Sequence, residues 1–160
     1  MSITIYHYTQ REHLDSICSD GILRREGHNI QSIVEQVNKG EIPIHMINHP
    51  SGLPISAVWR NLKVQYKLVG RYVWFTEESD VRCITAQQGF QKAMLVAKSD
   101  VVGAKRWIDV MRKQSVKSKK AKKNICTLNR TAKCCGDDIT KWWVVDRDVP
   151  LSKCERISLC

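Results

Sequence analysis

The first 23 residues constrain the fold most, because they specify a strand, a helix and a stop in that order. Residues 3–8 alternate β-branched and aromatic side chains, which is typical of a β-strand. Thr9 and Glu12 follow at the spacing of a capping box, a pair that often begins a helix. Apolar residues at helical spacing then lead to Gly21, a residue type that commonly ends a helix. We therefore expect the chain to open with a strand and a short helix.

The rest of the chain predicts more strands than helices. Further strands are expected at residues 71–76, 91–97, 142–145 and 156–159, and short helices at residues 31–37 and 104–111. No internal repeat and no Pro- or Gly-rich linker divides the 160 residues. The sequence therefore predicts one α+β domain, residues 1–160, with a largely antiparallel sheet and most of its helical pattern in the first two thirds.

The chain is strongly basic, with 26 Lys and Arg against 16 Asp and Glu and a formal net charge of +10. Such a balance favours encounters with polyanions and supports contacts to phosphate. Seven cations and no acid lie between residues 112 and 123: Arg112, Lys113, Lys117, Lys119, Lys120, Lys122 and Lys123. We expect this segment to form an exposed basic loop, or a frayed helix end, that contacts nucleic acid. The alternative is a loop that is merely solvated.

The cysteines and the hydropathy pattern predict where the protein works. Seven cysteines at irregular spacing favour reduced thiols over a disulfide framework. The arrangement nearest to a metal site contains no Cys-x-x-Cys pair, so no metal is expected; it comprises Cys126, Cys134, Cys135 and Cys154. No stretch approaches the roughly 20 apolar residues of a membrane helix, and the N-terminus does not resemble a signal peptide. These features predict a cytoplasmic protein with no membrane partner.

Three short segments together resemble a known fold family. Residues 5–9, Ile-Tyr-His-Tyr-Thr, followed by a helix and Gly21, resemble the opening of the ADP-ribosyltransferase (ART) fold. Residues 73–76, Val-Trp-Phe-Thr, are similar to the second motif of that fold, and residues 142–145, Trp-Trp-Val-Val, to its late strand. The resemblance is to small single-domain members of the toxin or defence type. It implies an α+β fold with split, mostly antiparallel sheets and a few short helices.

The resemblance also implies NAD as the small-molecule substrate. His7 would hold the ribose and the nicotinamide, Thr9 would support it, and Trp74 would offer a flat indole face to the nicotinamide. The flanking residues of the two motifs complete the expected NAD contacts: Tyr8, Phe75 and Thr76. Taken without the resemblance, His7 is equally typical of a half-buried strand histidine, and Trp74 of a core residue.

The sequence departs from the ART pattern at the catalytic acid. Lys141 stands where the family places the glutamate or aspartate that stabilises a cationic transition state. A preorganised charge of that kind contributes about 3–4 kcal/mol, so a lysine there would oppose the reaction. Asp138 is the expected replacement. Other nearby acids are Asp137, Asp146, Glu77 and Glu78.

Several functions follow from these features. The leading hypothesis is an NAD-dependent mono-ADP-ribosyltransferase that modifies a macromolecule, with nucleic acid held by residues 112–123. The alternative is a non-catalytic ART-like domain that binds nucleic acid or protein, which Lys141 and the basic segment favour. RNA 2′-phosphotransferase chemistry ranks lower because no arginine cluster accompanies His7 in the sequence. An unrelated basic α+β interaction protein is the remaining hypothesis.

Overall fold

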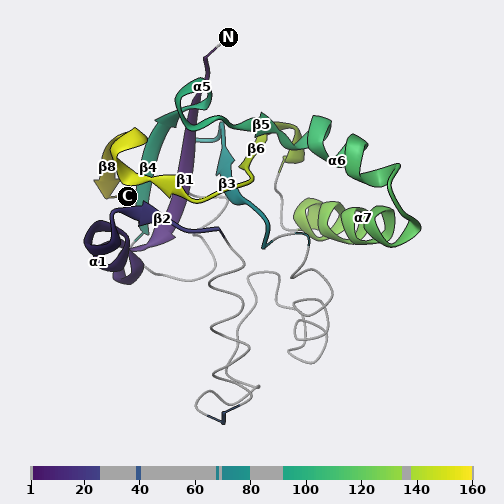
Figure 1. Cartoon of the computed structure of the whole chain (residues 1–160), viewed down its shortest axis with the longest axis horizontal. Coiled ribbons are helices and arrows are strands. Elements are labelled where there is room, and N and C mark those ends of the chain that lie inside the picture. The colour runs from purple at the N-terminus through teal and green to yellow at the C-terminus, as the bar shows by residue number, and fades with distance from the viewer. Residues whose placement is uncertain are drawn as a thin grey trace.

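A computed structural model describes residues 2–25, 39–40, 68, 70–79, 92–134 and 138–159 (Figure 1). Its main sheet has six strands in the order β5-β6-β3-β1-β4-β8, and all neighbours pair antiparallel. The strands of this sheet are β1 (Thr4–Gln10), β3 (Val73–Thr76), β4 (Lys92–Lys98), β5 (Lys105–Arg106), β6 (Trp142–Val145) and β8 (Cys154–Leu159). A second sheet pairs β2 (Ile22–Leu23) with β7 (Val149–Pro150), also antiparallel. The predicted mixed α+β class with a mostly antiparallel sheet is confirmed.

In the part of the chain that the structure describes, few helices accompany the sheets. They are α1 (Arg11–Asp20), α5 (Ser99–Val102), α6 (Trp107–Ser115) and α7 (Lys119–Cys134), with the 3-10 turns η2 (Ile139–Lys141) and η3 (Leu151–Lys153). Helices α6 and α7 lie at the β5–β6 side of the main sheet, whereas α1 lies at the side of β4 and β8 (Figure 1). Among the described residues, no helix combines the length and the apolar character needed to cross a membrane.

Two hydrophobic cores lie on opposite faces of the main sheet. Successive residues of the central strands contribute to one core and then the other, because side chains on a strand alternate between its faces. Val73 and Phe75 belong to one core, which Ile5, Leu23 and Val149 share. The intervening Trp74 packs against the other core, which is built around Val144, Trp107 and Ile125. We call these the β2–β7 face and the hairpin face of the sheet, after the elements that cover them. The adjacent tryptophans of β6 divide in the same way, with Trp143 on the β2–β7 face and Trp142 on the hairpin face.

The opening unit forms almost as predicted. Strand β1 runs through Gln10, so Thr9 lies inside the strand and the helix begins at Arg11. Helix α1 ends at Gly21, whose φ of 67° is the left-handed conformation that glycine adopts without a Cβ penalty. The Gly21 N–H donates to the Ile17 carbonyl at 2.9 Å, which satisfies one of the last free acceptors of the helix.

The structure confirms the strands predicted near residues 71–76, 91–97, 142–145 and 156–159. The helix predicted at residues 104–111 forms at Trp107–Ser115. The prediction of a loop at residues 112–123 is wrong, and the alternative of a helix end is closer, because the segment comprises the end of α6, a three-residue turn and the start of α7. Among the described helices the longest, α7, lies in the last third of the chain, where the sequence predicted little helix. The predicted helix 31–37 lies outside the described residues.

Candidate nucleic-acid interface

Helices α6 and α7 form a hairpin that is anchored to the sheet by one tryptophan. The Trp107 side chain is completely buried, and its ring meets that of Trp74 edge-on with centroids 4.9 Å apart. Its indole Nε1 donates to Asn129 Oδ1 on α7 at 3.2 Å, and Asn129 Nδ2 lies 3.3 Å from Met111 Sδ on α6. Trp107 therefore joins the sheet, α6 and α7, which fixes the hairpin as one unit.

The turn of the hairpin is short and is closed by a serine cap. Val116, Lys117 and Ser118 connect the helices, and Ser118 Oγ accepts from the Ala121 N–H at 3.0 Å. A serine oxygen on the N–H three residues later is the usual N-cap arrangement. The sequence held this signal, but the lysines around Ser118 obscured it, because they add no apolar periodicity at the start of the helix.

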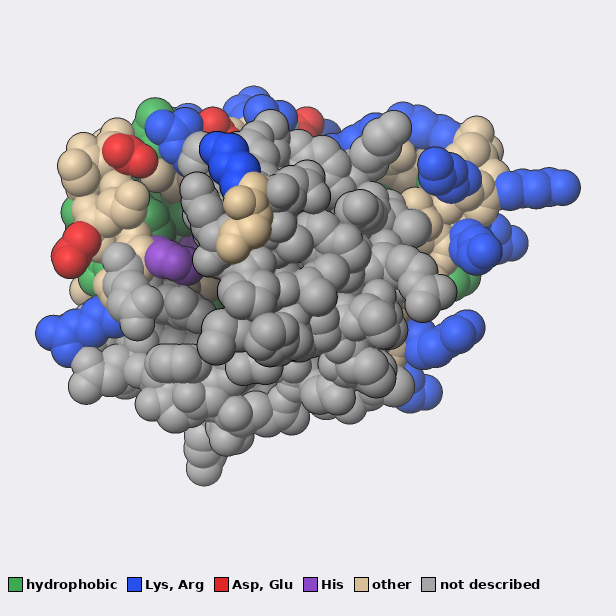
Figure 2. All heavy atoms as spheres, turned by 90° about the horizontal axis from the view of Figure 1, so that it is seen from below, with side chains coloured by type: hydrophobic (Ala, Val, Ile, Leu, Met, Phe, Trp, Pro, Cys, Tyr) green, Lys and Arg blue, Asp and Glu red, His purple; other side chains and the backbone are tan. Residues whose placement is uncertain are grey.

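Helix α7 has one packed side and one cationic side. The packed residues follow helical spacing from the first turn to the last: Ala121, Asn124, Ile125, Leu128 and Ala132. The opposite side carries exposed cations at comparable spacing: Lys119, Lys122, Lys123, Arg130 and Lys133. Exposed Cys126 lies within this cationic stripe. Lys and Arg side chains project from the end of the molecule that holds α6 and α7 (Figure 2).

The excess charge of the whole chain lies in the short strand β5 and the hairpin that follows it. Residues 105–134 hold 11 of the 26 Lys and Arg but one of the 16 Asp and Glu, Asp109. The other 130 residues therefore carry 15 charges of each sign, since 26 less 11 and 16 less 1 both give 15. The net charge of +10 is thus a local property and not a general solubility surface. The basic run 112–123 was recognised from the sequence, whereas Arg130 and Lys133, whose helical spacing continues the stripe on α7, and Lys105 on β5 were missed.

The cations of the hairpin are available to a partner. Within the described part of the chain, none of the seven cations of residues 112–123 forms an ion pair, and all seven are exposed. The ion pairs that do form there lie elsewhere, joining Arg24 to Asp20, Arg25 to Asp148, Arg106 to Glu77 and Lys141 to Glu78.

A pocket of about 490 Å³ adjoins the hairpin. It lies between α6 and the hairpin face of the sheet, where Tyr72, Val110 and Val144 line it. Five of its lining residues are cationic: Arg25, Arg71, Lys105, Lys113 and Lys117. Two acids, Asp109 and Asp146, also line it. We call this the cationic pocket. No local pattern in the sequence predicted this pocket, because its cations come from segments that are far apart along the chain.

The ART-like residues are placed differently from the expectation. His7 lies on the β2–β7 face, where its ring meets Phe75 edge-on at 5.7 Å and lines a small pocket of about 130 Å³. Its Nδ1 lies 2.7 Å from the Trp74 carbonyl oxygen, an acceptor, so Nδ1 carries the proton and Nε2 remains an acceptor. Burial lowers the pKa of the imidazole below its ordinary value of 6.5, more than this hydrogen bond raises it.

Trp74 does not join His7 in one site. Its ring lies on the hairpin face, packed edge-on against Trp107 and Trp142. The two rings are therefore on opposite faces of the sheet, because Trp74 and its neighbour Phe75 alternate along β3 and His7 contacts Phe75. Trp74 is partly buried and packs against the core of the hairpin face, which is closer to the alternative interpretation of the sequence.

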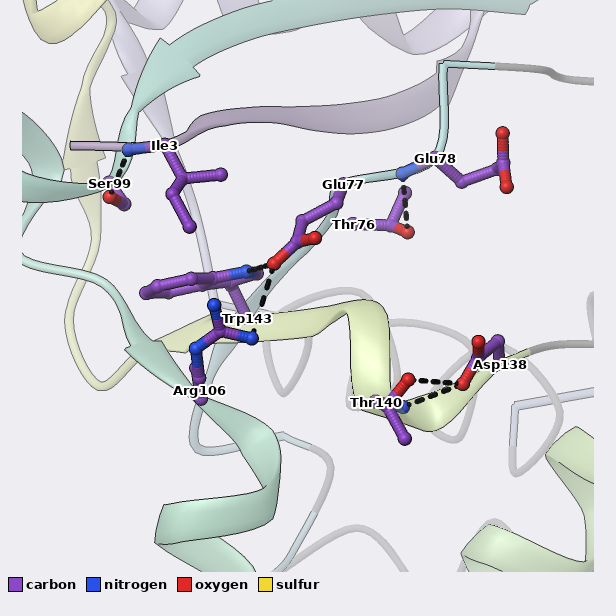
Figure 3. Close-up of polar contacts among 9 residues, drawn as sticks. All are labelled: Ile3, Thr76, Glu77, Glu78, Ser99, Arg106, Asp138, Thr140 and Trp143. Carbon is purple, nitrogen blue, oxygen red and sulfur yellow. Dashed lines mark hydrogen bonds and ion pairs between the residues drawn. The ribbon is translucent and has the colours of Figure 1, made fainter. Parts of the chain in front are cut away.

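The acids near the ART-like motifs are occupied with local contacts (Figure 3). Asp138 caps η2, accepting from the Thr140 hydroxyl at 2.6 Å and its N–H at 3.0 Å, and these bonds lower the pKa of its carboxyl. Lys141 Nζ lies 3.1 Å from Glu78 Oε2, and this hydrogen bond raises the pKa of the lysine.

Glu77 lies at the β2–β7 face of the same strand end. Its Oε1 accepts from Trp143 Nε1 at 2.8 Å and pairs with Arg106 Nη1 at 3.4 Å (Figure 3). The Arg106 guanidinium also lies 4.8 Å from the centre of the Trp143 ring. This cluster joins β3, β5 and β6 and has its charges balanced, so it is explained as a structural contact.

The other expected NAD contacts also have structural roles. Tyr8 Oη donates to the Glu78 carbonyl at 2.7 Å, and Thr76 Oγ1 accepts from the Glu78 N–H at 3.1 Å. Phe75 is buried in the core of the β2–β7 face. Thr9 alone of this set accompanies His7 in the small pocket. Asp137 lies outside the described residues.

Comparisons with known proteins identify no family: no family model, curated protein or solved structure is similar to the chain. Among the residues that the structure describes, no group of three or more His, Cys, Asp or Glu side chains is arranged to hold a metal ion. The distribution of charge on the folded chain is therefore the feature that supports a function best.

Proposed function

We propose that this domain binds the phosphate backbone of a nucleic acid through the α6–α7 hairpin. One observation carries the proposal, namely that residues 105–134, which comprise β5 and the anchored hairpin, hold the entire charge excess of the chain. Phosphate contacts from lysine and arginine supply most of the affinity of non-specific nucleic-acid binding. An array of exposed, unpaired cations on a fixed scaffold is suited to that role.

The helix itself favours an anionic partner. Lys119, Lys120 and Lys122 lie in the first turn of α7, which contains no acid. The positive end of the helix dipole disfavours cations there, and lysines three or four positions apart also repel each other. A bound phosphate would relieve both effects. The sequence therefore accepts a less stable free helix, which is consistent with a segment that works when an anion is present.

The hairpin is less suited to a membrane surface. A helix that binds in the membrane interface needs an apolar side that can enter the lipid. The apolar side of α7 is already packed, with Ile125 buried and Leu128 against the core of the hairpin face. Val116, in the turn, is the exposed large apolar residue of the hairpin, and one valine offers little area for insertion.

The first test compares two charge-matched double variants. Lys119→Gln/Lys123→Gln removes two cations from the stripe, while Lys153→Gln/Arg156→Gln removes two exposed cations from η3 and β8 near the opposite edge of the sheet. We expect the stripe variant to lose on the order of tenfold to fiftyfold in affinity for duplex nucleic acid at 0.1 M salt, because each lost phosphate contact removes about one unit of salt dependence. The matched variant should bind nearly as the unaltered chain does. Equal losses in both would contradict the proposal.

Two exposed thiols give an independent test. Cys126 lies in the stripe, whereas Cys18 lies on α1 at the other side of the sheet. Nucleic acid should slow maleimide labelling of Cys126 and leave that of Cys18 unchanged, with each site followed by peptide mass spectrometry. Protection of neither thiol at saturating nucleic acid would remove the hairpin as the contact surface.

As a second candidate, we propose ADP-ribosyl transfer from NAD at the His7 pocket. Strands β1 and β3 pair at one position, Tyr6 with Thr76, and His7 and Thr9 line a pocket beyond that pair. A pocket of about 130 Å³ would hold only one end of NAD, with His7 and Thr9 as contacts and without Trp74 or Asp138. The test is nicotinamide release from NAD by the unaltered chain, His7→Asn and the matched His13→Asn, with and without nucleic acid. Release by the unaltered chain that only His7→Asn abolishes would support this candidate; no release from the unaltered chain would end it.

A further inference from the structure

The cationic pocket differs from the stripe in being concave. An extended phosphate backbone needs a groove or a surface, and the stripe of α7 provides that. The pocket instead encloses about 490 Å³, within the range of 300–1,000 Å³ typical of small-ligand sites. Its volume therefore suits one compact group and not a run of nucleotides.

The charges of the pocket call for a multiply charged anion. Its cations converge from four separate segments: after β2 (Arg25), before β3 (Arg71), on β5 (Lys105) and from the end of α6 into the turn (Lys113 and Lys117). Arg25 is paired with Asp148 at 3.4 Å, whereas no ion pair holds the other four among the described residues. With Asp109 and Asp146 included, the lining carries three positive charges in excess. Such convergence is repulsive in the free protein, and a dianion would neutralise most of it.

The remaining lining fits an organic group attached to that anion. Tyr72 and Val144 belong to the core of the hairpin face and also line the pocket, so both give it apolar surface for a ring. Gln114 Nε2 lies 3.5 Å from Tyr72 Oη, and the two place polar groups beside that surface. Asp109 and Asp146 supply acceptors for hydroxyl and amino groups. A bare phosphate would use none of these features.

We propose that the cationic pocket binds a nucleoside phosphomonoester, either as a free nucleotide or as the phosphorylated end of a strand. A phosphomonoester carries about −1.5 to −2 charges at pH 7, against −1 for a backbone phosphodiester, so it neutralises more of the charge excess of the lining. The sugar and base then take the apolar and acceptor surface. In its strand-end form this inference rests on the proposed binding of nucleic acid by the hairpin; in its free-nucleotide form it does not.

The test uses the full chain, two variants and three probes. Arg71→Gln/Lys105→Gln removes two pocket cations that lie outside residues 112–123, and Lys119→Gln/Lys123→Gln removes two stripe cations. The probes are a fluorescent nucleoside 5′-monophosphate, one oligonucleotide with and without a terminal phosphate (at either end), and inorganic phosphate as competitor. Thermal unfolding of each variant checks that it is folded, and Lys105→Arg keeps the pocket charge as a further control.

The expected pattern separates the two sites. The affinity of the unaltered chain for the nucleotide should exceed its affinity for inorganic phosphate at least tenfold, or its affinity for the phosphorylated oligonucleotide should exceed that for the unphosphorylated one at least fivefold. The first result indicates a free nucleotide and the second a strand end. The pocket variant should lose that binding or preference and keep its affinity for the unphosphorylated strand, while Lys105→Arg retains both.

Two results would overturn the inference. One is an unaltered chain that binds the nucleotide no better than inorganic phosphate and shows no end preference. The other is a folded pocket variant that still binds the nucleotide as the unaltered chain does. Failure of the proposed function looks different, because the stripe variant would then bind both oligonucleotides normally whatever happens to the nucleotide.

Discussion

The two faces of the central sheet present different chemistry. The β2–β7 face has the His7 pocket, about 130 Å³ in volume, in which Asp20 pairs with Arg24 at 3.7 Å. The hairpin face has a pocket nearly four times as large, with three positive charges in excess, beside a helix that is cationic along its whole exposed side. The histidine motif and the basic run therefore belong to separate surfaces, and a function that joins them has to act across the sheet.

The difference between the two faces shows that adjacent residues of one strand motif can belong to different sites. Trp74 and Phe75 are adjacent in a segment that resembles one motif, yet one packs against the hairpin and the other beneath His7. Adjacent strand residues point in opposite directions, so each must be assigned to a face before it is assigned to a site. The following experiments test whether the two faces are independent.

The largest effect is expected where the hairpin meets the sheet. Trp107→Ala removes a fully buried indole and its bond to Asn129, so the free energy of unfolding should fall by about 3–5 kcal/mol. Equilibrium denaturation in urea measures this. Trp107→Phe should lose clearly less, because it keeps most of the volume. A loss below about 1 kcal/mol in the alanine variant would mean that the hairpin is not anchored through this residue.

A smaller effect is expected at the start of α7. Ser118→Ala removes the cap on the Ala121 N–H and should cost about 1 kcal/mol in unfolding free energy. Ser115→Ala is the matched control, since Ser115 Oγ donates back to the Met111 carbonyl within α6 and caps no helix. Ser118→Asp should restore the cap and favour the helix dipole, while weakening nucleic-acid binding by its charge. Equal costs for the two alanine variants would contradict the assignment of the cap.

Salt should stabilise the free protein slightly. Repulsion among the lysines of α7 is screened as ionic strength rises, whereas the surface ion pairs contribute little that salt can remove. We expect the melting temperature to rise by about 2–4 °C between 20 and 300 mM salt, and to rise less in Lys119→Gln/Lys123→Gln. A melting temperature that falls with salt would show that attraction between charges outweighs repulsion in the hairpin.

The His7 face should respond to pH instead. Burial lowers the pKa of His7 in the folded state, so below pH 6.5 the unfolded chain takes up the proton first. Stability is therefore fully present above pH 6.5 and is lost as pH falls through the folded pKa. We expect the unfolding free energy, measured in urea, to fall between pH 7.5 and pH 5.5 in both variants. The fall should be smaller in His7→Gln than in His13→Gln. An identical fall in the two variants would show that His7 is not the source of the pH dependence. The effect is absent at pH 7.5, so it is the smallest of the four predicted effects at neutral pH.

The sequence predicted the strands better than the hairpin, for a physical reason. Strands such as 73–76 and 142–145 are rich in β-branched and aromatic residues whose partners lie in the core, so a local pattern is sufficient. Helix α7 packs through Ala121, Asn124 and Ala132 as well as Ile125, and small or polar residues at core positions weaken the periodic signal. The cationic side of α7 is the stronger pattern in the sequence, so this region was predicted to be a basic loop.

The candidate site was predictable only in part. Residues 112–123 are contiguous, and their density identified the phosphate surface directly. The cationic pocket requires Arg71 and Lys105 to meet Lys113, which the pairing of β3, β6 and β5 determines. Long-range pairing of that kind is not visible in a local pattern. His7 and Trp74 lie on opposite faces of the sheet, and Asp138 is not among the described residues that line the His7 pocket.

The confinement of the charge excess to residues 105–134 makes the molecule an electric dipole as well as a cation. A sphere with evenly spread charge is attracted to a polyanion but arrives in any orientation. A dipole experiences a torque, so it turns before contact and arrives with α6 and α7 foremost. At physiological salt the field persists for only about 8 Å, so this alignment occurs in the last approach, and lower salt lengthens the distance over which it operates. The hairpin thus sets the angle of approach as well as the strength of attachment.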